Sequence, residues 1–294
     1  MRALSSVTVV VFCGAVLQGQ GPEAGVSAGL AQARARVVSG VRYNLSIALR
    51  EHAARLTGHE AITFSLSNND APLVIDFRDL DATGAVTNGH ISRVVVNGSA
   101  AAPEQVNGHI VIAALLLHQG SNRVELDFDS AIAQANRAVT RITDPVDSRE
   151  YLYTLFVPMD ASLAFPCFDQ PDLKGRFTLE ASVPEGWTVV SNTREHVENR
   201  VFRFDETQPI STYLFAFAAG PFEQLDAPGA LRLFVRKSML ARAKEEWPEV
   251  ATYTRRGMNE MVSFFAQPFP FPKYDQVLLP GFPYGGMEHA GATF

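Results

Sequence analysis

One short segment near residue 290 combines an acidic side chain with a flexible backbone, and its residue types suit binding of a charged ligand. It follows a strand-like run at 276–280 and consists of Gly285, Gly286, Met287, Glu288 and His289. Glycines lack a Cβ, so they let backbone N–H and C=O groups come close to a bound molecule. A lone carboxylate beside such a backbone suits a protonated amine. Taken alone, Glu288 would equally fit a solvated loop carboxylate, so its surroundings must decide.

The elements that precede this segment are predicted from period-two alternation of apolar and polar residues. Eight runs between residues 43 and 222 show strand patterns: 43–49, 62–66, 73–77, 94–96, 110–112, 124–128, 177–181 and 213–217. Turn residues separate them at Asn88-Gly89, Asn97-Gly98, Asn107-Gly108 and 119–122. This spacing predicts a large antiparallel β domain, either a sandwich or a curved saddle.

The pattern changes after the turn-rich stretch at 226–229. A further strand is expected at 231–235, and a helix follows whose apolar face holds Val250, Gly257, Met258, Met261, Val262 and Phe265. Prolines at 268, 270 and 272 end that helix. We therefore expect a β domain over residues 28–228 and the beginning of an α/β domain over residues 229–294.

Composition limits the functional classes. The formal net charge of -6 supplies no basic surface for nucleic acid. The first residues, with Arg2 followed by an apolar run to Leu17, predict a signal peptide over 1–27 with cleavage between Gly19 and Ala28. That run is too short for a stable membrane span, although a buried strand or helix remains an alternative. Its removal would leave Cys167 without a disulfide partner, which favours a periplasmic or secreted protein.

Four motifs occur in order in the second half of the chain. They are the Asp-Ala-Ser-Leu-Ala-Phe-Pro-Cys-Phe-Asp-Gln-Pro stretch from Asp160, the Thr-Gln-Pro-Ile-Ser-Thr-Tyr-Leu stretch from Thr207, the Phe-Pro-Phe-Pro-Lys-Tyr-Asp stretch from Phe269, and the Gly-Gly-Met-Glu-His segment from Gly285. Together they resemble the motifs of the zinc aminopeptidase N family, peptidase family M1. The resemblance covers about residues 150–294, whereas residues 42–149 match only as a generic β domain.

The resemblance implies a role for each residue of the Gly-rich segment. Glu288 would bind the free α-amine of a peptide substrate, while Gly285, Gly286 and Met287 would line the cleft and His289 would stand at its end. The family's fold implies that residues 229–294 begin a thermolysin-like catalytic domain. Its catalytic zinc is held by an H-E-x-x-H motif and a further Glu, which lie downstream of this segment. We therefore expect the front part of an aminopeptidase, with no catalytic or zinc-binding residue among these 294.

Three positions depart from the family pattern. His289 stands where the family usually has Asn, and an imidazole can change its charge near neutral pH. Val157 occupies the place of a second amine-binding Gln or Glu. Ser162 replaces an Arg. His59-Glu60 begins like a zinc motif, but Thr63 takes the place of the second His, so we interpret His59 as a surface residue.

Two other functional classes are alternatives to the enzyme. A non-catalytic relative would use the β domain and cleft as an interaction scaffold, and would be expected to lose Glu288 or the zinc motif. A secreted β-sandwich binding module would explain residues 42–222 but not the helix and the Gly-rich segment after Leu231. The retained Glu288 favours the enzyme.

Overall fold

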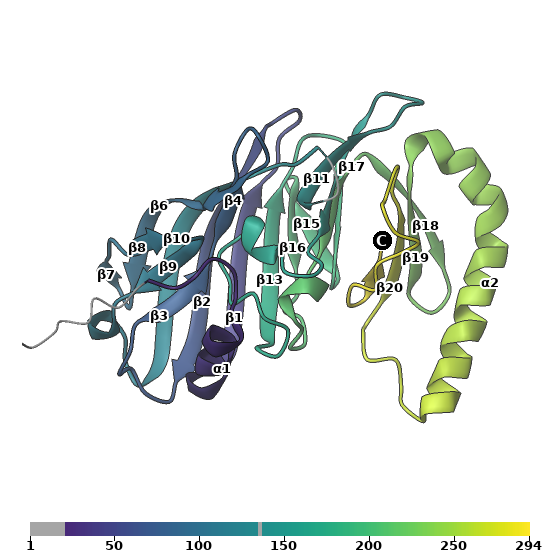
Figure 1. Cartoon of the computed structure of the whole chain (residues 1–294). Coiled ribbons are helices and arrows are strands. Elements are labelled where there is room, and N and C mark those ends of the chain that lie inside the picture. The colour runs from purple at the N-terminus through teal and green to yellow at the C-terminus, as the bar shows by residue number, and fades with distance from the viewer. Residues whose placement is uncertain (1–20, 135–136) are drawn as a thin grey trace, which may run out of the picture.

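The computed structural model describes residues 21–134 and 137–294, which fold mainly as β-sheet (Figure 1). Residues 1–20, which hold most of the predicted signal peptide, lie outside the described part. The largest sheet has eight strands, in the order β15 (Glu195–Glu198), β16 (Val201–Phe204), β13 (Gly175–Ser182), β1 (Val38–Ala48), β2 (Arg55–Leu66), β10 (Gly120–Ala131), β6 (His90–Val96) and β7 (Ser99–Ala100).

Smaller sheets and four short 3-10 turns complete the β structure. The second sheet contains β11 (Ala138–Thr143), β12 (Glu150–Leu155), β17 (Phe217–Gly220) and β14 (Thr188–Ser191). The third contains β18 (Phe222–Ala227), β19 (Leu231–Arg236), β20 (Tyr274–Leu278) and β21 (Ala292–Thr293). The others are β3 (Leu73–Asp76) with β9 (His109–Ile112) and β8 (Glu104–Val106), and β4 (Arg78–Leu80) with β5 (Val86–Asn88). The turns are η1 (Ala114–Leu116), η2 (Ala161–Leu163), η3 (Thr212–Leu214) and η4 (Lys237–Met239).

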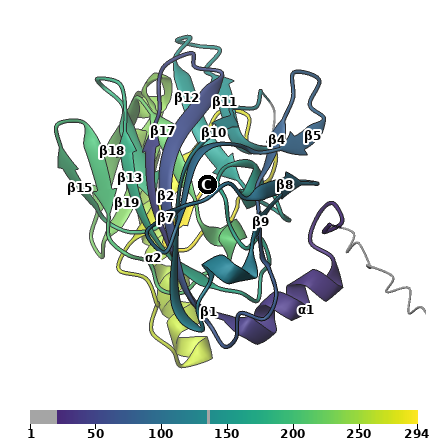
Figure 2. The same ribbon diagram turned by 90° about the vertical axis from the view of Figure 1, so that its left-hand side faces the viewer.

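Two α-helices lie on different sides of the sheets. Helix α1 (Ala28–Val37) runs beside the first strands, and α2 (Leu240–Phe265) follows the outer side of the third sheet (Figures 1 and 2). The sequence patterns did not predict α1. Its only buried residue is Arg34, so it lacks the apolar stripe from which a helix is recognised.

The predicted mainly β fold is confirmed. Strand β1 alternates almost perfectly between buried and exposed residues, because one face of the large sheet packs on the core while the other meets solvent. Neighbouring strands of this sheet run antiparallel except for β1 and β13, which pair in parallel from Val41 opposite Gly175 to Ala48 opposite Ser182. That pair joins residues 134 positions apart without a hairpin, which local alternation cannot reveal.

The predicted turns differ in their physical basis. Asn97-Gly98 and Asn107-Gly108 are two-residue hairpin turns with positive φ at both positions, as this sequence pair favours. The turn predicted at Asn88-Gly89 is not such a hairpin, because β5 pairs with β4 and β6 pairs with β10 and β7. A Cβ on Gly89 would lie 2.1 Å from the Phe77 ring, so close packing requires glycine there.

The strand predicted at 213–217 is wrong over most of its length. Residues 212–214 form η3, and β17 begins only at Phe217. The Asn192 side chain accounts for the difference, since its amide donates to Leu214 O (2.8 Å) and its oxygen accepts from Ala216 N (2.9 Å). A side chain therefore satisfies backbone groups that a strand would pair with a neighbouring strand.

The third sheet lies between two apolar layers. On one side Leu231, Leu233 and Val235 of β19 pack against Ala243 and Trp247 of α2. On the other side, Phe234 and Val277 belong to a second apolar cluster, which also includes residues of β12 and β17 of the second sheet. The predicted domain division at 228/229 falls in the turn of the β18–β19 hairpin, whose strands share one sheet. The division itself stays a prediction.

The C-terminal half of α2 extends beyond this packing. A helix of 26 residues is about 39 Å long, whereas the six residues of β19 span about 20 Å. Much of the apolar face predicted for the helix therefore borders an open cavity of about 530 Å³ between α2 and residues 267–276. Met261 and Phe265 expose 60% and 63% of their surface. Within the described residues, no helix is long and apolar enough to cross a membrane.

This exposed helix face predicts self-association of the chain, because large contiguous apolar surfaces promote it. We expect Phe265→Lys to shift the chain toward monomer in sedimentation velocity at several concentrations. Asn259→Lys, which adds the same charge at another exposed position of α2, is the matched control. A wild-type chain that stays monomeric throughout would contradict the prediction.

Glu60 is an isolated carboxyl in the core of the large sheet. It lies on β2 opposite Leu45 and Leu126 of the two adjacent strands and is fully buried. Neither carboxyl oxygen has a hydrogen-bond partner among the described residues. Burial raises the pKa of Glu60 well above its usual value, because the charged form is poorly solvated there.

Glu60→Met is expected to stabilise the chain by roughly 1–3 kcal/mol at pH 7, by removing an unsatisfied buried group. The unfolded chain ionises this carboxyl above its ordinary pKa while the folded chain keeps it neutral. The gain should therefore shrink as the pH falls toward 4. Urea denaturation measures it, with the exposed Glu185→Met as control; a gain that is the same at both pH values would contradict this account.

Candidate functional site

The Gly-rich segment forms an extended loop between β20 and β21 that is closed at its end by backbone hydrogen bonds. Met287 N donates to Phe294 O (2.8 Å) and Phe294 N donates to Met287 O (3.2 Å). Side chains then alternate, because extended backbone points successive residues to opposite sides. Met287 and His289 are buried, whereas Glu288 is exposed. The predicted amine-binding residue therefore points to solvent from a backbone fixed on both sides.

Glu288 is free to bind a cation, and its neighbours leave room for one. No hydrogen bond or ion pair joins Glu288 to another described residue. Gly285 and Gly286 are both exposed, and a Cβ on Gly285 would meet nothing within 4 Å. Neither glycine has positive φ. Since protein packing does not require glycine at these two positions, their small size is consistent with access of a ligand to the backbone.

The downstream end of the segment is held tightly. Gly291 has a φ of 72°, and a Cβ there would lie 2.5 Å from Asn192 O, so glycine is required by both conformation and space. Asn192 donates to Ala290 O (2.9 Å), and Asp275 N donates to Gly291 O (3.0 Å). These contacts set the position of Glu288 relative to β14 and β20.

Lys273 is the central anchor of this arrangement. Its side chain is fully buried, and its ammonium donates to Ser191 O (2.6 Å), to Gly291 O (3.3 Å) and to the Asp275 carboxylate. Burial lowers the pKa of Lys273, while the charge of Asp275 opposes that shift. Asp275 thus keeps a cation in place beneath the Gly-rich segment.

A buried arginine extends the network to the large sheet. Arg232 of β19 donates to both oxygens of Asp275 (2.8 and 2.7 Å) and to Glu195 of β15 (3.0 Å). Burial opposes the charge of Arg232, but the hydrogen bonds that it donates to Asp275 and Glu195 outweigh burial and raise the pKa of the guanidinium. Two cations and two carboxylates therefore balance one another at the junction of three sheets.

His289 is a neutral residue in this environment. Its side chain is buried, and neither ring nitrogen has a hydrogen-bond partner among the described residues. The ring packs edge-on against Phe294, with centroids 4.6 Å apart. Burial lowers the pKa of His289 to about 3, so the ring stays neutral near pH 7. The change of charge near neutral pH that the sequence suggested does not occur.

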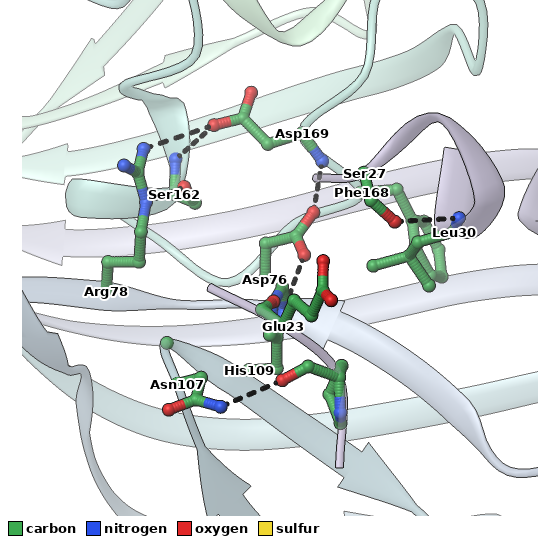
Figure 3. A network of polar contacts seen from close by, with 12 residues as sticks. Glu23, Ser27, Leu30, Asp76, Arg78, Asn107, His109, Ser162, Phe168 and Asp169 are labelled. Atoms are coloured by element: carbon green, nitrogen blue, oxygen red, sulfur yellow. Dashed lines mark hydrogen bonds and ion pairs between the residues drawn. The ribbon is translucent and has the colours of Figure 1, made fainter. Parts of the chain in front are cut away.

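The other two departures from the family pattern are also located. Val157 is half-buried and packs against the apolar cluster that contains Met287, so this place offers no polar group to an amine. Ser162 accepts a hydrogen bond from Arg78 Nε (2.9 Å). The same guanidinium lies 3.3 Å from Asp160. It also lies 4.0 Å from Asp169 (Figure 3), so Arg78 of β4 supplies a positive charge beside both carboxylates.

The motif that begins at Asp160 is buried and structural. Asp169 accepts from Ser162 N (2.9 Å) and Thr212 Oγ1 (2.8 Å), which ties two of the four motifs together. Burial raises the pKa of Asp169. Its sequence signal was strong, but its side chains hold the fold and do not reach the Gly-rich segment.

Metal-binding groups are absent from the part of the chain that the structure describes: no cluster of three or more His, Cys, Asp or Glu could hold an ion there. His59 is partly exposed and lies 2.7 Å from Asp127, an ion-pair partner on the neighbouring strand.

The fold is mainly β, and its third sheet with helix α2 presents an acidic, glycine-rich segment whose downstream end is fixed by hydrogen bonds. The sequence is similar to those of known proteins. Residues 40–214, more than half of the chain, match the Peptidase M1 N-terminal domain. The chain therefore belongs to the M1 peptidase family, as the motifs predicted.

Named relatives match over different lengths. Aminopeptidase N of Streptomyces lividans is 35% identical over 212 residues, which cover 69% of this chain and 24% of that protein. Probable M1 family aminopeptidase 1 of Encephalitozoon cuniculi is 27% identical over 274 residues, covering 87% and 31%. Aminopeptidase M1 of Arabidopsis thaliana is 24% identical over 260 residues, covering 85% and 30%. The chain thus spans about a quarter to a third of these relatives' length.

Replacing the central anchor tests how the segment is held. Lys273→Met should destabilise the chain by about 3–5 kcal/mol, because it leaves the buried Asp275 with one cation fewer. Urea denaturation compares it with the exposed Lys174→Met, for which we expect a change within about 0.5 kcal/mol. Equal effects of the two substitutions would show that the Lys273 network contributes little.

Proposed function

We propose that the chain forms the amine-binding side of a zinc-dependent aminopeptidase, which removes N-terminal residues from peptides. The observation that carries this proposal is the unpaired, exposed Glu288 on a segment fixed from beneath by Lys273 and Asn192. The relatives, named as aminopeptidases, support the reaction class.

The chemistry of this segment accounts for a preference for free N-termini. A carboxylate held in place binds an ammonium through a charge-assisted hydrogen bond, which is stronger than a neutral one. A substrate with a blocked N-terminus would leave Glu288 without its partner, so it binds less well. The open backbone at Gly285 and Gly286 can hydrogen-bond the peptide as an added strand would. These residues bind and orient the substrate.

Zinc would polarise the scissile carbonyl and activate water in the complete enzyme. The described residues contain no cluster of three or more His, Cys, Asp or Glu that could serve as its ligands. We infer that residues 1–294 by themselves neither bind catalytic zinc nor hydrolyse peptides. Stoichiometric tight zinc binding together with release of N-terminal amino acids by this chain would contradict the inference.

The decisive experiment is to sequence the coding DNA beyond the codon for Phe294 and to assay the protein that the full reading frame encodes. An in-frame H-E-x-x-H followed by a Glu ligand supports the enzyme. A frame without these ligands favours the scaffold, with an amine site and no chemistry.

In an active full-length protein, Glu288→Gln should lower kcat/KM for a free-amine substrate by about 30- to 1,000-fold, from roughly 2–4 kcal/mol of lost ion pairing. The effect follows from loss of the carboxylate charge with the shape retained. Glu185→Gln, an exposed position on the β domain, is the control. If Glu288→Gln leaves kcat/KM unchanged, amine binding lies elsewhere.

We propose further that the protein is exported and cleaved upstream of Pro22. The predicted cleavage interval runs from Gly19 to Ala28, but Pro22 O and Glu23 O accept hydrogen bonds from Asn107 and His109 within the folded domain. Cleavage after residue 27 would remove both contacts. N-terminal sequencing of the protein from the periplasm or medium tests this, and a mature chain beginning after Glu23 would refute it.

A further inference from the structure

The chain from Pro22 to Val37 lies against the β domain as a strap, hereafter the N-terminal strap, residues 22–37. The β domain holds it mainly by side chains that donate to its backbone. Asn107 Nδ2 donates to Pro22 O (3.0 Å), and His109 Nε2 lies 2.9 Å from Glu23 O (Figure 3). Further along the strap, Gln170 Nε2 donates to Ala31 O (3.0 Å). Within the strap, Ser27 caps α1 by accepting from Leu30 N.

Apolar packing holds the end of the strap, where the half-buried Val37 contacts the main apolar core. Arg34 is the only residue of α1 that is buried, and it donates to both oxygens of Asp76 (2.7 and 2.5 Å). Its guanidinium also lies 5.7 Å from the centre of the Phe168 ring. Upstream of Val37 the strap is therefore attached largely by hydrogen bonds and charge, which protonation can change.

His109 joins the strap to the charged cluster. Its Nδ1 lies 2.8 Å from Asp76 Oδ1, and its Nε2 faces the Glu23 carbonyl oxygen. Both neighbours are acceptors only, so both ring nitrogens must carry hydrogen for both contacts to be hydrogen bonds. This geometry requires a doubly protonated imidazolium that is almost fully buried.

Three groups surround the contact between His109 and the strap. Asp76 of β3 faces its ring directly, Arg34 of the strap lies on the other side of Asp76, and Asp169 donates its backbone N–H to Asp76 (2.9 Å). Burial by itself lowers the pKa of His109, but the hydrogen bond and charge of Asp76 outweigh it and raise that pKa above its usual value. Burial likewise opposes ionisation of Asp76, yet His109 and Arg34 hold its pKa below the usual value.

We propose that the N-terminal strap is a pH-sensitive clasp, docked while His109 is doubly protonated and loosened when His109 loses one proton. The neutral ring keeps its hydrogen on Nδ1, where the Asp76 carboxylate is the stronger acceptor. The Nε2 lone pair then faces Glu23 O, and the contact to the strap is lost.

The direction of the pH effect follows from the raised pKa of His109. The folded state binds this proton more tightly than the unfolded state. The protonated His109 therefore contributes its full stabilisation of the docked strap below the ordinary pKa of histidine. This stabilisation is lost as the pH rises through the higher value of the docked state. The strap should therefore loosen as the pH rises above the ordinary pKa of histidine, before the β domain unfolds.

Hydrogen exchange followed by mass spectrometry tests the clasp. Wild-type chain is measured between pH 5.5 and 9, with rates corrected for the intrinsic pH dependence of exchange. We expect protection of residues 22–37 to fall by about tenfold or more across this range, while protection of β2 and β10 stays constant. His109→Gln should show low strap protection at every pH, because Gln cannot supply two charged donors.

Two further variants keep the test decisive. His118→Gln changes an exposed histidine whose ring makes no described contact, and it should behave as wild type. Asn107→Gly removes the contact to Pro22 outside the charged cluster and tolerates the positive φ of this turn position, so it should lower strap protection but keep the pH dependence. Strap protection in the wild type that does not change with pH, or that falls together with β2 and β10, would overturn the proposal. So would an unaltered pH dependence in a folded His109→Gln.

Discussion

The buried charge network of Lys273, Asp275, Arg232 and Glu195 holds the functional part of the structure together. The network links three sheets: Glu195 lies on the large sheet, Arg232 and Asp275 lie on the third, and Lys273 donates to the backbone of the second at Ser191. Buried ion pairs contribute little net stability compared with apolar packing, but breaking one of them leaves an unpaired buried charge. The network therefore fixes how the three sheets meet more than it strengthens any of them.

This arrangement explains the contrast between the two ends of the Gly-rich segment. At Gly291 and Ala290 the backbone is bonded to Lys273, Asp275 and Asn192, and glycine at 291 is imposed by its surroundings. At Gly285 neither the backbone conformation nor the neighbouring atoms require glycine. The rigid end places Glu288, and the open end leaves space for a ligand. His289 lies between them and stays neutral, so Glu288 is the one charge that this segment presents.

The sequence predicted the β fold well because one-sided burial of a sheet produces alternation that is visible in a single strand. It also predicted the family, because a motif concentrates its information in consecutive residues; the role of Glu288 stays a prediction. The sequence did not predict the parallel β1–β13 pair, the contact of Arg78 with Ser162, or helix α1. Each depends on residues far apart in the chain: Arg78 meets Ser162, and Arg34 meets Asp76. Lys273 was recognised as part of a motif, but its burial and its three acceptors follow only from the fold.

The burial of Lys273 has a consequence for chemical labelling. The chain has four lysines, and Lys174, Lys237 and Lys244 are exposed while Lys273 is enclosed. An amine-reactive reagent therefore modifies three side chains in the native state, and reaches the fourth only when the junction of the three sheets opens. The acylation rate of Lys273, read against the other three in one digest, measures the opening frequency of the loop that carries Glu288.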